Sequence, residues 1–122
     1  AYIPMVPPKE FLQAPDGWTW HDRIVINDTC YIHGDPKSGR NAAWSWMNEH
    51  RMSTVIGHIH GHGGVQYSAS PFRTTFAANA GCLIDPAAMA FRYGNKYANK
   101  ATLGCVVVKN STHAHFIPME TK

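Results

Sequence analysis

The sequence predicts a mixed α/β (α+β) fold of about eight short strands with two or three helices. Two observations carry this prediction. Apolar runs of strand length alternate with breaks rich in Gly, Pro and Asn, and only a few segments carry helical spacing or helix-start signals. The length of 122 residues suits a single domain, 1–122, that can bury a core of its own.

The first part of the fold is an irregular lead-in followed by a hairpin. Residues 1–20 contain four prolines, so we expect extended chain there with one short helical turn at 9–13, and the folded part at 21–122. Residues 23–27 and 30–33 read as strands. Asn27 and Asp28 between them are good turn residues, which predicts a hairpin. Pro36 then forces the chain out of the sheet.

A helix at 40–51 and a strand at 53–57 follow. Ala43, Trp46, Met47 and His50 recur at helical spacing, and Ser38 is a candidate cap. The strand leads into a segment with three histidines and several glycines, residues 57–64, where a helix is disfavoured.

The remaining elements alternate in the same way. We expect strands at 65–68, 74–78 and 82–84, with a turn at Asn79-Ala80-Gly81. Asp85 as N-cap and Pro86 as first helical residue predict a helix that runs to about residue 93. Strands at 102–109 and 112–119, joined by Asn110-Ser111, complete the fold as a hairpin.

Composition excludes several classes of protein. The apolar fraction of 44%, the charged fraction of 16% and the formal net charge of +3 are those of an ordinary soluble domain. No run of Lys and Arg favours nucleic-acid binding, so nucleic acid is expected only as a substrate, and no stretch is apolar enough for a bilayer. Three widely spaced cysteines, Cys30, Cys82 and Cys105, predict buried thiols in a reducing compartment, and hence a cytoplasmic location.

Three histidines suggest a metal-binding site. His58 and His60 are two residues apart, so on extended chain their side chains point to the same side, as two ligands of a metal require. His33 ends another strand, where open sheets place their sites. From these residues alone, metal binding and a purely structural role are about equally supported.

Three further polar residues lie beside these histidines. Asp35 is either a hydrogen-bond acceptor that orients His33 or a turn residue before Pro36. Arg40 is either a phosphate contact or a solvated surface charge. His62 is either a substrate contact or a solvated loop residue. We assign no catalytic residue.

The order of these motifs resembles the C-terminal signature of calcineurin-like metallophosphoesterases. The resemblance rests on His33-Gly34-Asp35, a helix containing Asn41-Ala42-Ala43, the Gly57-His58-Ile59-His60 element, and Asn79-Ala80-Gly81, and it covers about residues 20–118. It implies the C-terminal half of a β-sandwich. It also implies a phosphate-ester hydrolase in which His33 and His58 bind one divalent ion (Mn, Fe or Zn) and His60 binds a second.

The departures from that family are equally specific. Its upstream Asp-x-His, Gly-Asp-x-x-Asp and Gly-Asn-His-Asp/Glu motifs are absent, and the carboxylates before His33 follow no such pattern: Glu10, Asp16, Asp22 and Asp28. The chain therefore resembles a half-enzyme that is inactive alone and needs its N-terminal half or a homodimer partner. Truncation, a partial reading frame and a split enzyme all fit this pattern.

Two other functions stay open at this point. A small stand-alone metal-binding protein of cupin type fits His58-x-His60, although no glutamate follows in residues 61–70. A non-enzymatic, dimeric interaction module with a vestigial site fits a half-sandwich that exposes an apolar sheet face.

Overall fold

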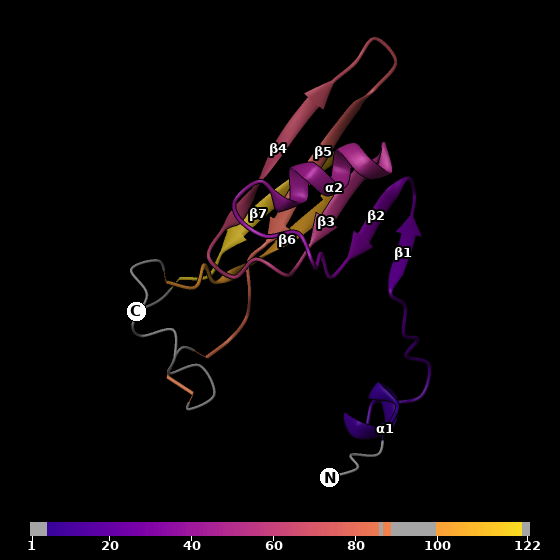
Figure 1. Cartoon of the computed structure of the whole chain (residues 1–122), viewed down its shortest axis with the longest axis vertical. Helices are drawn as coiled ribbons and strands as arrows, with labels where there is room; N and C mark the ends of the chain where they lie inside the picture. The colour runs from indigo at the N-terminus through magenta and orange to yellow at the C-terminus, as the bar shows by residue number, and fades with distance from the viewer. Residues whose placement is uncertain (1–4, 86, 89–99, 121–122) are drawn as a thin grey trace.

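The computed structural model describes residues 5–85, 87–88 and 100–120. Within them the fold is mixed α+β, with two helices and seven strands in two sheets (Figure 1). The elements are α1 Pro8–Phe11, β1 Arg23–Ile26, β2 Thr29–Ile32, α2 Ala42–His50, β3 Ser53–Ile56, β4 Gly63–Ala69, β5 Thr74–Ala80, β6 Gly104–Lys109 and β7 His113–Pro118.

The larger sheet is mixed and has the strand order β1-β2-β3-β5-β4. Its three central strands, β2, β3 and β5, run parallel, and β1 and β4 flank them antiparallel. The smaller sheet is the antiparallel hairpin β6-β7. Because the carboxyl ends of parallel strands meet at one edge, the residues that follow β2, β3 and β5 gather at the same edge of the sheet.

Helix α2 and the β6-β7 hairpin cover opposite faces of the larger sheet (Figure 1). On the helix side, Ala43 and Met47 pack against Ile56 of β3. On the hairpin side, Val55 and Phe76 pack against Ala114. The neighbouring residues Val55 and Ile56 thus point to opposite faces of the sheet, as the alternation of side chains along a strand requires.

Both hairpin turns predicted from the sequence are confirmed. Asn27 and Asp28 have positive φ values of 47° and 65°, and Asn110 and Ser111 have values of 51° and 54°. Two successive positive φ values are the mark of a type I′ turn, which matches the twist of the flanking strands. Asn and Asp adopt this conformation more readily than most residues.

Two local predictions differ from the structure, and a third falls largely outside the described residues. Asn79 and Ala80 are not in a turn, because β5 continues through them and pairs with Gly64 and Gly63 of β4. Cys82 forms only an isolated bridge to Leu103 rather than a strand over 82–84. The predicted helix at 86–93 lies outside the described residues, apart from positions 87–88.

The cysteines only partly match the expectation of buried thiols. Cys30 is buried, Cys82 is half-buried and Cys105 is exposed on the outer side of β6. Burial raises the pKa of the Cys30 thiol, with an opposing influence from the charge of Arg23. None of the helices within the described ranges has the length and apolar character that a bilayer crossing demands.

Candidate functional site

His33 and His58 meet at the carboxyl edge of the parallel strands. His33 directly follows β2, and His58 lies two residues beyond the end of β3. The backbone amide of Gly57 donates a hydrogen bond of 3.0 Å to the carbonyl of His33, which extends the β2-β3 pairing by one step. The parallel register of these strands therefore brings together two histidines that are 25 positions apart.

The two imidazole rings are in direct hydrogen-bonding contact. Nδ1 of His58 lies 2.9 Å from Nε2 of His33, so one nitrogen donates and the other accepts. The ring centroids are 4.8 Å apart and the rings are inclined at 72°. His33 is exposed and His58 is half-buried, so solvent reaches the pair.

The backbone beside His33 is fixed by close packing and by a tryptophan. Gly34 has φ of +115°, and a side chain there would approach Cβ of Ile56 to 2.9 Å, so both conformation and space require glycine. The indole Nε1 of Trp46 on α2 donates a hydrogen bond of 2.5 Å to the carbonyl of Gly34. The sequence placed Trp46 on the helix face but carried no sign of this bond.

Lys37 connects the same loop to α2 a second time. Its Nζ lies 4.7 Å above the Trp46 ring and 2.7 Å from Oε2 of Glu49. A cation over an indole face is attracted by the ring quadrupole. The loop that follows His33 is therefore held against α2 through both its backbone and a side chain.

His60, the third predicted ligand, does not join the pair in a three-ligand group. It is exposed, and its carbonyl accepts a 2.7 Å hydrogen bond from the amide of Thr102. In the part of the chain that the structure describes, no set of three or more His, Cys, Asp or Glu side chains is arranged to hold a metal ion. Of the three predicted ligands, the structure thus brings two imidazoles, those of His33 and His58, into contact.

The other candidate residues occupy two hollows at this edge. Asp35 lines a hollow of about 450 Å³ together with His33 and Trp46, yet its carboxylate forms no hydrogen bond to His33. Arg40 and His62 line a separate hollow of about 300 Å³ that also includes Asn79. The sequence did not suggest Asn79 as a site residue because it read that position as a turn.

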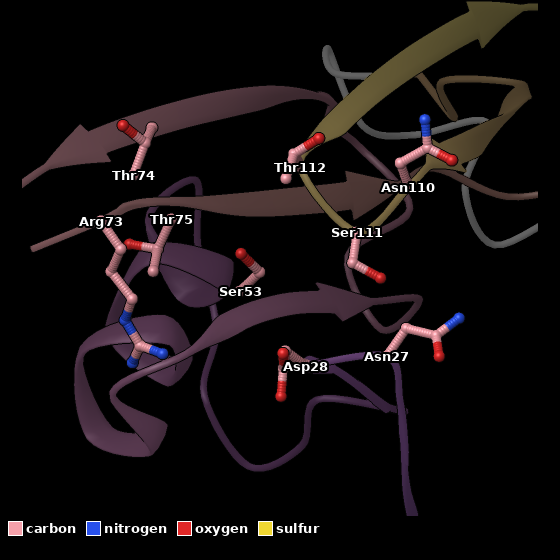
Figure 2. Close-up of a pocket in the computed structure, with 9 residues that line it drawn as sticks. All are labelled: Asn27, Asp28, Ser53, Arg73, Thr74, Thr75, Asn110, Ser111 and Thr112. Atoms are coloured by element: carbon pink, nitrogen blue, oxygen red, sulfur yellow. The ribbon is translucent and has the colours of Figure 1, made fainter.

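Another polar hollow, of about 390 Å³, lies at the opposite end of the fold (Figure 2). It is found where β3 and β5 begin, and both type I′ turns contribute to it. Nine residues line this hollow, none of them histidine: Asn27, Asp28, Ser53, Arg73, Thr74, Thr75, Asn110, Ser111 and Thr112. The guanidinium of Arg73 donates a hydrogen bond to the carbonyl of Arg51.

These geometric features stand without support from known proteins. Comparisons with protein-family models, with curated proteins and with solved structures returned no match.

Proposed function

We propose that this chain is the C-terminal part of a metal-dependent phosphoesterase, in which His33 and His58 bind one divalent ion and His60 binds a second. The proposal rests on the 2.9 Å separation of Nδ1 of His58 and Nε2 of His33. Two imidazole nitrogens that bind one ion at about 2.0–2.1 Å, at angles between octahedral and tetrahedral, lie roughly 2.9–3.4 Å apart. The separation of the two nitrogens therefore matches that of neighbouring ligands, and metal binding replaces the shared proton as each ring turns its lone pair toward the ion.

The donor set fits such an ion only in part. Two imidazoles supply half of a first shell. Asp22 and Asp35 line the same hollow as His33, but within the described residues no carboxylate joins the pair in a group of three ligands. A bound metal pair would supply an activated water and charge neutralisation at the phosphate. The chain's own contribution is to hold His33 and His58 at the sheet edge through Gly34 and Trp46.

Metal binding by the isolated protein tests this proposal. Elemental analysis after incubation with Mn²⁺ or Zn²⁺ and dialysis should give about one ion or fewer per chain, and His58→Ala should abolish this binding. His113→Ala, an exposed histidine on β7, is the matched control and should retain the metal. Absence of metal from the parent protein would overturn the proposal. Two ions per chain would contradict the half-site.

The parallel strands disfavour the cupin alternative. A cupin is a jelly roll of antiparallel strands, whereas β2-β3 and β3-β5 are parallel pairs.

A dimeric interaction module is the second candidate, and the edge strand β1 favours it. All four residues of β1 are exposed, including Ile24, Val25 and Ile26 at 36%, 51% and 49%. An exposed apolar edge strand is a template for pairing with another chain. Light scattering coupled to size exclusion would show a dimer, and Val25→Lys should then return it to a monomer. A monomeric parent protein would remove this candidate.

A further inference from the structure

The 300 Å³ hollow beside the histidine loop has a wall unlike the other hollows at this edge. Three glycines line it, one in the loop after His60 and two at the start of β4, together with polar side chains and the apolar residues Val65 and Ala77. We call it the Asn79 pocket and define it by Arg40, His62, Gln66, Asn79, Thr102 and glycines 61, 63 and 64. Its lining contains no Phe, Tyr or Trp ring, and His62 carries its one aromatic side chain.

Thr102 ties this pocket to the segment that carries His58 and His60. Its amide donates a 2.7 Å hydrogen bond to the carbonyl of His60, and its hydroxyl donates a 3.1 Å bond to the carbonyl of Gly61. Asn79, on the other wall, is the register partner of Ile56 in β3. The Asn79 pocket and the histidine pair therefore share the same strand ends and the same loop.

Asn79 carries an unsatisfied hydrogen-bonding atom at this wall. The residue is only 9% exposed, and its Nδ2 donates a long bond of 3.5 Å to the carbonyl of Arg40. Its Oδ1 is buried and accepts no hydrogen bond from any residue that the structure describes. Buried polar atoms in native proteins almost always have a partner, so an orphan acceptor at a pocket wall indicates a missing donor.

Donor groups without partners lie beside this acceptor. In the described ranges, neither the exposed side chain of Arg40 nor the half-buried ring of His62 forms a hydrogen bond or ion pair. Helix α2 begins just after Arg40, and no side chain caps its N-terminus. The dipole of this helix N-terminus adds to the attraction of the neighbouring Arg40 for an anion.

We propose that the Asn79 pocket binds a phosphate group that keeps one proton. Its anionic oxygens would accept from Arg40 and His62, and its P–OH would donate to Oδ1 of Asn79. An anion without a proton cannot satisfy that oxygen, which makes Asn79 a determinant of specificity. Because Oδ1 is buried, a side chain of the wall has to shift when the anion enters.

This proposal also identifies a class of substrate, and in that respect it rests on the proposed function. If the histidine edge hydrolyses one phosphate ester, the neighbouring Asn79 pocket would hold a second phosphate group of the same molecule in its monoanionic form, which a phosphomonoester keeps below about pH 6. The substrates would then be esters with two phosphates rather than one.

A comparison of phosphate with sulfate separates the contacts made to the anionic oxygens from the hydrogen bond that the P–OH donates to Asn79. Inorganic phosphate carries a P–OH at neutral pH, whereas sulfate is fully ionised. Titration of the metal-free protein at pH 7 and constant ionic strength, followed by amide chemical shifts, should show changes at glycines 61, 63 and 64. Phosphate should bind about tenfold more tightly than sulfate, the change expected for one hydrogen bond.

Two variants separate the contribution of Asn79 to specificity from the contribution of Arg40 to affinity. Asn79→Ala should remove the preference for phosphate over sulfate, whereas Arg40→Gln should weaken both anions about tenfold, as loss of a charged donor predicts. Lys109→Gln, which removes the same charge from the exposed side of β6, is the control and should change neither. Arg40→Gln also covers the case in which the buried Asn79 variant fails to fold.

The outcomes are independent of the metal centre. No shifts with either anion, equal affinity for both anions in the parent protein, or equal weakening by Lys109→Gln would each overturn the proposal. This experiment contains no metal, so its result does not depend on ion binding by His33 and His58. A protein that binds no phosphate in the Asn79 pocket would therefore leave the metal-site proposal standing. A protein that binds no metal would likewise leave the phosphate-binding proposal standing.

Discussion

The hydroxyl of Tyr67 on β4 binds both backbone groups of Ala114 on β7. It accepts a 3.0 Å hydrogen bond from the amide of Ala114 and donates a 3.0 Å bond to its carbonyl. Ala114 is 4% exposed and belongs to the core between the two sheets. One side chain thus satisfies both polar groups of a residue in the opposite layer and fixes how the β6-β7 hairpin docks.

Tyr67→Phe should lower the free energy of unfolding by about 1–3 kcal/mol, because it leaves a buried amide and a buried carbonyl without their partner. Urea denaturation followed by tryptophan fluorescence measures this. Tyr31→Phe is the control: Tyr31 is half-buried, and its hydroxyl has no hydrogen-bond partner within the described ranges. Equal loss in both variants would mean that the bonds to Ala114 contribute nothing specific.

Gly63→Ala should lower the free energy of unfolding by about 1–3 kcal/mol through overpacking. A Cβ at Gly63 would overlap the ring of Phe116, which lies against this glycine from the other sheet. Gly61→Ala is the matched control, since nothing lies within 4 Å of a Cβ at that position. Thermal denaturation of both variants tests the difference, and a neutral Gly63→Ala would show that Phe116 moves aside freely.

Trp46→Phe should weaken Zn²⁺ binding about tenfold, by analogy with other residues that orient metal ligands. The substitution keeps an aromatic side chain but removes the indole N–H that holds the carbonyl of Gly34, next to His33. Trp44→Phe, also on α2 and half-buried, should leave the affinity unchanged. Calorimetric titration gives both affinities; unchanged binding in Trp46→Phe would assign the indole bond to stability alone.

His50 should make the protein less stable in mild acid. Burial is the main cause that lowers the pKa of His50 below its ordinary value of 6.5, and the charges of Arg23 and Lys37 lower it further against the opposing influence of Glu49. Its Nδ1 lies 3.2 Å from Oγ1 of Thr54, its ring stacks on Trp46, and its Nε2 is buried without a partner. Protonation of Nε2 would therefore place an unpaired charge beneath the helix.

The sign of this effect follows from proton binding. Below about pH 6.5 the unfolded chain protonates His50 while the folded protein resists it, so the unfolded state binds more protons and stability falls with falling pH. His50→Phe should flatten the decline between pH 7.5 and 5.5 in urea denaturation, whereas His21→Phe, at an exposed site, should not. An unchanged slope in His50→Phe would assign the pH dependence to other groups.

Local signals predicted the turns and the meeting of two histidines. Asn27-Asp28 and Asn110-Ser111 carry their conformational preference in their own side chains, so adjacent residues were sufficient. His33 and His58 each follow a short apolar strand joined by one helix, and such a crossover makes the strands parallel. Their proximity therefore followed from topology rather than from any contact visible in the sequence.

The features that sequence reasoning missed depend on distant partners. Gly63 and Gly64 have weak strand preference, so the start of β4 was placed too late, and Asn79 was read as a turn although it pairs with Gly64. The bonds of Trp46 to Gly34 and of Thr102 to His60 join loops to elements far along the chain. Nothing in the local composition distinguishes such residues from ordinary helix or loop positions.

The polar hollow of Figure 2 marks an end of the molecule that carries none of the proposed metal ligands. Both type I′ turns reach it, and it lies where the parallel strands begin, away from the edge that carries His33 and His58. Hairpin tips of this kind tolerate added residues better than strands do. A fluorescent label or a surface tether attached at Asn110 would therefore leave the histidine edge facing solvent, which makes that tip the preferred anchor for immobilised binding assays.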